Sequence, residues 1–150
     1  DRLPDSLPCV KGIIPLFWAD HYIRHNQRRQ EHLASLGLPL ARRRVLELGA
    51  GIGDHTTFFM DRECAVCVTD GRAENVEFLR KRYHWMRVEL IDLEQPLTFK
   101  DTFEVVYAYG LLYHLSDPAS AIARMASLPA RRWASAKQSA TGITATPGCP

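Results

Sequence analysis

The 150-residue sequence has no apolar run approaching the roughly 20 residues that a membrane-spanning helix needs. Its formal net charge is only +2, so charge gives no reason to expect a nucleic-acid partner. No signal-peptide pattern is visible, but the sequence opens with Asp1 rather than Met, so a fragment or a processed form that has lost a targeting segment stays an alternative. These absences predict a cytoplasmic protein without a membrane anchor, and they favour a small molecule as its partner.

Cysteine is also scarce, with four residues in the chain. Cys64 and Cys67 have C-x-x-C spacing, but they lead into the apolar stretch 65–70, which has the pattern of a strand. Positions three apart on a strand face opposite sides, so the two sulfurs are poorly placed to hold one ion. We therefore expect structural cysteines in a reducing compartment and no metal site.

Basic residues are clustered rather than spread. The two clusters are "RHNQRR" at 24–29 and "ARRRV" at 41–45. Because the rest of the chain balances their charge, we interpret them as solvated helix faces or loops.

A helix is predicted over residues 17–36, ended by Gly37 and Pro39. Five of its residues fall on one side of the helix, namely Trp18, Tyr22, His25, Arg29 and Leu33. This stripe is only partly apolar, which indicates a half-exposed helix.

Strand and helix patterns then alternate along the chain. Strands are expected at 44–49, 65–70, 87–92 and 103–110, and helices at 54–62, 72–84 and 117–128. Asp54 is placed to cap the first of these helices, and Asp117, followed by Pro118, the last. The alternation predicts an α/β fold, a Rossmann-like mostly parallel sheet with helices on both faces.

The pattern stops after the fourth strand and its following helix, and further strands would be expected. We expect a domain over residues 1–128 and an irregular tail over 129–150, rich in Ala, Ser, Thr, Gly and Pro. Two interpretations of this tail stay open. It is either disordered, or the chain is truncated or out of frame there.

Three glycines follow the first strand in "VLELGAGIGDH". They permit a sharp turn and a close approach of a ligand to the backbone. The dinucleotide fingerprint is G-x-G-x-x-G, but here the third glycine, Gly53, comes one place early and Asp54 takes its position. A carboxylate at a helix N-terminus competes with a diphosphate and tolerates a cationic ligand. This favours S-adenosylmethionine over a nicotinamide dinucleotide.

Acidic residues near the strand ends fit a nucleoside ligand. Glu47 lies among apolar strand neighbours, and it is either an anchor for the amino-acid end of the cofactor or a charge reaching solvent. Asp70 ends the second strand, where a carboxylate accepts hydrogen bonds from ribose hydroxyls in both cofactor classes. Asp92 ends the third strand and is either an acceptor for an adenine amino group, with Leu93 near the ring, or a turn residue.

Four segments resemble, in order and spacing, the successive motifs of class I S-adenosylmethionine-dependent methyltransferases. They are "VLELGAGIGDHT", "VCVTDGRAEN", "VELIDLEQP" and "FEVVYAYGLLYHLSDPASAIARMA", within residues 40–128. The resemblance implies a Rossmann-like sheet and transfer of the sulfonium methyl group to an acceptor. It also implies three further strands in complete members of the family, which the segment after Leu128 does not match.

The resemblance assigns cofactor-binding roles to specific residues. By it, Asp70 holds the ribose, Asp92 and Leu93 hold the adenine, and Tyr109 and Gly110 line the floor near the methionine amino group. The methionine-end loop consists of Glu47, Gly49, Ala50, Gly51 and Gly53.

His114 is the candidate general base, for an acceptor that must lose a proton, because it follows the fourth strand at the carboxyl edge. A structural loop histidine is the alternative. Tyr109 and Tyr113 are candidate walls of the acceptor pocket, and His21, Tyr22 and Arg24 are candidates to close over the cofactor. Two other functions stay open, an inactive fragment that only binds cofactor and an NAD(P)-dependent oxidoreductase.

Overall fold

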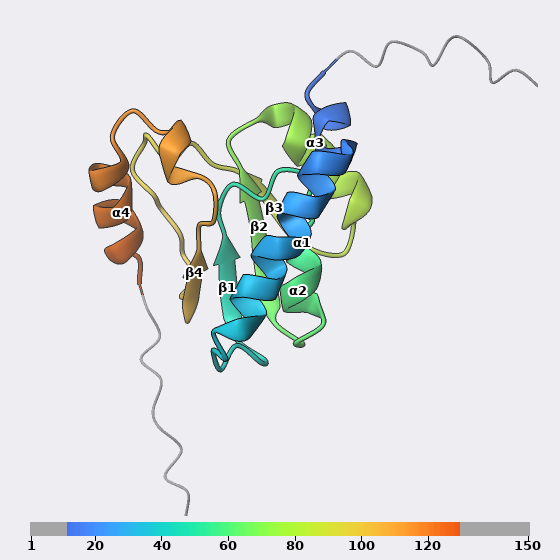
Figure 1. The fold of residues 1–150 in the computed structure, drawn as a ribbon. Helices are drawn as coiled ribbons and strands as arrows, with labels where there is room; N and C mark the ends of the chain where they lie inside the picture. Colours follow the sequence, from blue (N-terminus) through green and yellow to red (C-terminus); the bar gives the residue numbers. More distant parts are fainter. Residues whose placement is uncertain (1–11, 130–150) are drawn as a thin grey trace, which may run out of the picture.

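The computed structural model describes residues 12–129 of the chain, and the expected tail at 129–150 lies, from residue 130 on, outside the described residues (Figure 1). Within 12–129, no helix is long and apolar enough to cross a membrane.

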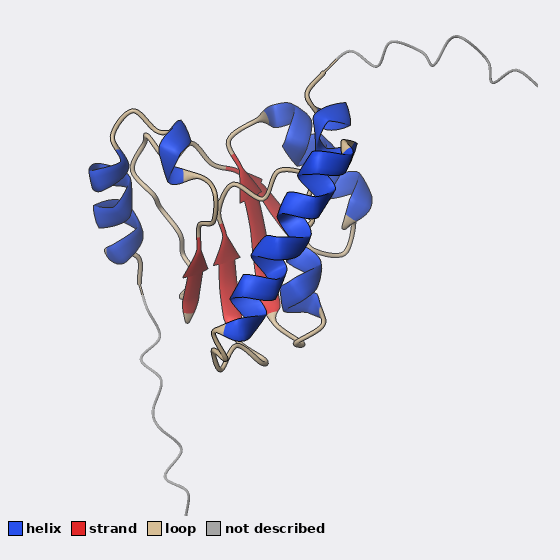
Figure 2. Cartoon of the chain, viewed as in Figure 1, coloured by secondary structure: helices blue, strands red, loops and turns tan. Residues whose placement is uncertain are grey.

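The centre of the molecule is a parallel sheet of four strands. They are β1 (Arg44–Glu47), β2 (Ala65–Asp70), β3 (Arg87–Leu90) and β4 (Val105–Tyr107). Their spatial order is β3-β2-β1-β4, and every neighbouring pair is parallel, so the arrows in Figure 2 point the same way. The order reverses between β1 and β4, and at such a switch point an open α/β sheet forms a ligand crevice. The predicted α/β, Rossmann-like fold is confirmed.

Helices connect and cover these strands. The elements are η1 (Ile14–Trp18), α1 (Asp20–Ser35), α2 (Thr56–Met60), α3 (Ala73–Arg82), η2 (Leu112–His114) and α4 (Pro118–Ala126). Figure 1 shows α1, α2 and α3 together on one side and α4 apart from them, beyond β4. The predicted cap of the last helix is confirmed, because Asp117 Oδ1 accepts a hydrogen bond of 3.0 Å from the backbone N–H of Ser120.

Side chains alternate between two apolar clusters, one on each face of the sheet. One cluster joins the strands to α1, α2 and α3, with Phe59 at its centre. The other contains Leu46, Leu48 and Cys67 and extends to Leu128 after α4. Cys64 packs against the first cluster while Cys67 lies in the second, and both thiols are free, as expected for structural cysteines.

The prediction that Asp54 caps the following helix is wrong. The helix is shorter than expected, and its N-cap residue, His55, makes no side-chain cap hydrogen bond. The Asp54 carboxylate instead accepts a hydrogen bond of 3.1 Å from Asn26 Nδ2 and pairs with Arg82 at 2.9 Å. These partners from α1 and α3 outcompete the local cap.

The buried stripe of α1 also differs from the prediction. Asn26 and Leu33 are its buried residues, whereas Trp18 and His25 are exposed. Asn26 is buried because Asp54 lies opposite it, a partner 28 residues away in sequence.

Candidate functional site

A cavity of about 490 Å³ lies at the carboxyl ends of β1, β2 and β4. The loops after these strands form its floor, and η1 and α1 contribute Phe17, His21 and Tyr22 to its lining. The prediction that His21 and Tyr22 lie over a ligand site agrees with this placement, whereas Arg24 is not among the lining residues.

Most of the predicted site residues meet at this cavity. Those that line it are Glu47, Gly49, Ala50, Gly51, Asp70, Tyr109, Gly110 and His114. His114 is exposed, and its ring lies 4.3 Å from that of Tyr113, which also lines the cavity.

Three predicted residues are not among the lining residues. Gly53 lies behind the loop, where its carbonyl accepts a hydrogen bond from the Tyr83 hydroxyl. Asp92 Oδ1 accepts a hydrogen bond from the N–H of Glu94, which is the turn role left open above. Leu93 is buried in the second apolar cluster. Their predicted contacts with cofactor stay predictions.

The glycine loop requires residues without a Cβ. Gly51 has φ +61°, and a Cβ there would lie 2.8 Å from the ring of Phe17. Gly53 has φ +82°, and a Cβ would lie 2.5 Å from the ring of Tyr83. Positive φ disfavours other residues at both positions, so the loop packs between η1 and α3 only because these residues are glycine.

Asp70 is 7% exposed and links the glycine loop to β2. Its Oδ2 accepts a hydrogen bond of 2.8 Å from the N–H of Gly51, and its Oδ1 accepts from Arg72 N–H and Asn75 Nδ2. A carboxylate has about four acceptor positions, so Oδ2 keeps one for a ligand donor. Asn75 also lines the cavity, and its buried Oδ1 has no donor among the described residues.

Glu47 is 1% exposed at the cavity floor. Its Oε2 accepts a hydrogen bond of 2.7 Å from the Thr56 hydroxyl, and no Lys or Arg of the described residues forms an ion pair with it. Burial raises the pKa of Glu47 to about 7, the Thr56 hydrogen bond opposes this, and the Asp54 charge adds to it. A cationic ligand would stabilise the ionised form.

The buried His55 and the half-buried Tyr107 form a polar pair near Glu47. His55 Nδ1 lies 2.5 Å from the Tyr107 hydroxyl, and its buried Nε2 has no partner within the described part of the chain. Burial, helped by the Arg29 charge, lowers the pKa of His55 to about 4, so the ring is neutral at pH 7. Burial raises the pKa of Tyr107, and the nearby Glu47 carboxylate adds to the rise.

A cation faces this floor from α1. The guanidinium of Arg29 lies 5.6 Å from the centre of the Tyr109 ring, a cation–π contact, and a Cβ on Gly110 would lie 3.0 Å from it. Among the described residues, Arg29 forms no ion pair with a carboxylate. The cavity therefore presents the Arg29 cation from α1, the carboxylates of Glu47 and Asp70 from the strands, and the exposed Arg72 after β2.

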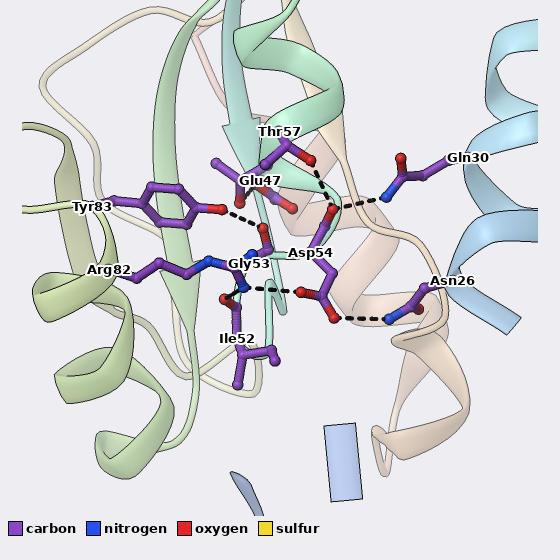
Figure 3. A network of polar contacts seen from close by, with 10 residues as sticks. Asn26, Gln30, Glu47, Ile52, Gly53, Asp54, Thr57, Arg82 and Tyr83 are labelled. Carbon is purple, nitrogen blue, oxygen red and sulfur yellow. Dashed lines mark hydrogen bonds and ion pairs between the residues drawn. The ribbon is translucent and has the colours of Figure 1, made fainter. Parts of the chain in front are cut away.

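Asp54 ties three elements together (Figure 3). Its carboxylate binds Asn26 of α1 and Arg82 of α3, and its carbonyl accepts hydrogen bonds from Gln30 at 2.8 Å and Thr57 at 3.1 Å. The same Arg82 donates to the carbonyl of Ile52. The ion pair with Arg82 partly neutralises the Asp54 carboxylate, so this carboxylate repels a diphosphate less than the sequence suggested. The argument against a dinucleotide therefore depends more on Glu47.

The sequence did not indicate several polar cavity residues, among them Asn26, Arg29, His55 and Asn75. His55 follows the glycine loop directly, and Asn75 lies five residues after Asp70, so their places near the loop and the acidic strand end were usable signals. Asn26 and Arg29 carry no such signal, because their contacts depend on how α1 packs. Within residues 12–129, no group of three or more His, Cys, Asp or Glu side chains could hold a metal ion.

A parallel sheet with a glycine loop, acidic strand ends and a cavity at the switch point defines a nucleoside-binding α/β domain. A family model described as a methyltransferase domain matches residues 45–130, more than half of the chain. The chain therefore belongs to the methyltransferase domain family. No curated protein matches it.

Solved structures share the fold. The YcgJ protein from Bacillus subtilis has 20% identity and a TM-score of 0.59, over 69% of this chain and 47% of that one. The SAM-bound amino pentose methyltransferase CalS10 from Micromonospora echinaspora has 20% identity and a TM-score of 0.55, over 71% and 46%. The N-terminal domain of EvdMO1 with SAH bound has 24% identity and a TM-score of 0.60, over 74% and 50%. The chain thus spans half or less of the length of each of these structures.

Proposed function

We propose that this protein is an S-adenosylmethionine-dependent methyltransferase that methylates a small molecule. The observation that carries the proposal is the buried carboxylate of Glu47, which lies at the floor of the cavity without a cationic partner among the described residues. The family match supports methyl transfer, and two of the similar structures have SAM or SAH bound. We also propose a cytoplasmic location, on the cysteine argument given above.

The cavity fits the groups that this cofactor carries. Glu47 would hold the ammonium of the methionine end, and Arg29 the carboxylate, since each lacks a partner of opposite charge among the described residues. The free acceptor position of Asp70 and the Oδ1 of Asn75 would take hydrogen bonds from ribose hydroxyls, which are donors. The buried Glu47 carboxylate and the buried Oδ1 of Asn75 would thus each gain a partner.

S-adenosylmethionine, when bound, supplies a methyl group on a sulfonium centre, ready for in-line displacement. The protein has to position both reactants and exclude water, for which Phe17 and Tyr22 lie over the floor. For an acceptor that loses a proton, we propose His114 as the base, since it lines the same cavity. The tyrosines 109 and 113 would wall the acceptor side.

Calorimetric titration of the full chain tests the cofactor assignment. We expect S-adenosylmethionine to bind and to release a proton between pH 6 and 7, because the ammonium favours the ionised form of Glu47. Repeating the titration in buffers of different ionisation enthalpy measures that proton. Glu47→Gln should remove the release, and Glu63→Gln, which changes an exposed carboxylate, should keep it.

Three outcomes would contradict the proposal in different ways. Binding of NADH but not of S-adenosylmethionine would support the oxidoreductase. Binding of neither would remove the cofactor assignment. Binding of S-adenosylmethionine without transfer of labelled methyl to any compound of a metabolite extract would favour a domain that only binds cofactor.

A further inference from the structure

A second concave surface adjoins the cavity along α1. This groove is lined by His21, Arg24, His25, Arg28, Arg29 and Tyr109. His21, Arg29 and Tyr109 also line the cavity, so the groove begins at the cavity mouth and continues along the helix. A molecule lying in it would reach the floor beside Tyr109.

The groove carries positive charge and no carboxylate. Three arginines line it, and none of them forms an ion pair within residues 12–129. The Arg24 side chain donates a hydrogen bond to the backbone carbonyl of Asp20, which leaves its charge uncompensated. By contrast, the arginines at positions 42, 43, 44, 82 and 87 are each paired with an acidic side chain.

Like charges at successive helical turns repel each other by a few tenths of a kcal/mol per pair. Arg24 and Arg28 are four residues apart, so the arrangement costs stability unless an anion neutralises it. Planar guanidinium groups bind carboxylate and phosphate oxygens with paired hydrogen bonds. A small anion at the cavity mouth would therefore be held by Arg24 and Arg28, while its far end reaches Tyr109.

We propose that this groove binds the anionic group, a carboxylate or a phosphate, of the small molecule that accepts the methyl group. That the bound molecule is the methyl acceptor rests on the proposed function. The proposal replaces our interpretation of residues 24–29 as a merely solvated helix face. Arg24 and Arg28 select the acceptor by its charge, and Tyr109 separates this groove from the floor that holds the cofactor.

Amide chemical shifts of the ¹⁵N-labelled full chain test the groove with defined probes. Benzoate and phenyl phosphate should both shift resonances of residues 21–29. The probe that binds with the higher affinity shows whether the groove prefers a carboxylate or a phosphate. Benzamide, the neutral analogue of benzoate, should bind at least about tenfold more weakly because it gains no charge-assisted hydrogen bond. Equal binding of benzoate and benzamide would overturn the proposal.

Two double variants remove the same net charge at different places. R24Q/R28Q should weaken the binding of both anions at least about tenfold, whereas R42Q/K81Q, at exposed positions outside the groove, should change it less than about twofold. Equal losses in the two variants would show only a general charge effect and overturn the proposal. The proposal would also be overturned if a ten-nucleotide DNA strand shifted the same resonances at a lower concentration than phenyl phosphate, because this would indicate a macromolecular ligand.

Titration of R24Q/R28Q with S-adenosylmethionine separates this proposal from the proposed function. We expect unchanged cofactor affinity, since neither arginine lines the cavity. Wild-type protein that binds phenyl phosphate in the groove but not S-adenosylmethionine would refute the proposed function and keep the anion site. Wild-type protein that binds S-adenosylmethionine but neither anion would refute the anion site and keep the proposed function.

Discussion

Two buried side chains at the cavity floor should make the stability of the protein depend on pH in opposite directions. Glu47 has a pKa of about 7 in the folded protein, against an ordinary value of 4.5. The stability it contributes is complete below pH 4.5 and is lost as the pH rises through 7. His55 has a pKa of about 4, against 6.5, so its contribution is present above pH 6.5 and lost as the pH falls through 4.

Each difference corresponds to about 3 kcal/mol of unfolding free energy. The two contributions nearly cancel in the wild type between pH 4.5 and 6.5, and substitution of either residue should expose the other. Glu47→Gln, which keeps an acceptor for Thr56, should give a protein that gains about 3 kcal/mol, relative to the wild type, as the pH rises from 4.5 to 7. His55→Gln should lose a similar amount, relative to the wild type, from pH 4 to 6.5.

Urea unfolding followed by circular dichroism at half-unit pH intervals measures these differences. All other titrating groups are common to the three proteins, so subtraction of the wild-type curve isolates the substituted side chain. A flat difference curve for Glu47→Gln would mean that the carboxylate is hydrated or paired in the folded protein. That result would refute both its raised pKa and its proposed role toward an ammonium.

Further substitutions test the loop and its supports. Asp54→Ala should lower the unfolding free energy by about 2–3 kcal/mol in urea, because it leaves the buried amide of Asn26 without its acceptor, and the exposed Asp61→Ala should change it by less than about 0.5. Equal effects of the two would contradict the network. Asp70→Ala should weaken S-adenosylmethionine binding by about 1–3 kcal/mol in calorimetry, and unchanged affinity would remove the ribose assignment. Gly51→Ala should lower the melting temperature, since its backbone has positive φ and its Cβ has no room; an unchanged value would show that the loop relaxes.

The sequence predicted the sheet and its helices because their signals are local. Apolar runs at 44–49 and 65–70 and the capping pair Asp117 and Pro118 need no knowledge of distant residues. Every predicted strand and helix of the described part is present, although several are shorter than their apolar stretches. The glycine loop could be predicted for the same reason, since its glycines follow directly on the first strand.

What the sequence did not reveal depends on contacts between distant segments. Asp54 has the local pattern of a helix cap, and only the packing of α1 and α3 against the loop gives it Asn26 and Arg82 as partners. The partner of Tyr107 is likewise a residue 52 positions away, His55. Such pairings decide which polar groups are left for a ligand, and periodicity carries no information about them.

The helix α1 presents two neighbouring faces with separate tasks. One face, with Asn26, Gln30 and Leu33, fastens the helix to the loop and core, and the next, with Arg24 and Arg28, borders the groove. Residues on the groove face can therefore vary without loss of the contacts that hold α1 against the loop and the core. A library randomised at positions 24, 25 and 28, which border the groove but do not line the cavity, would be a compact way to vary the proposed acceptor preference with the cavity residues unchanged.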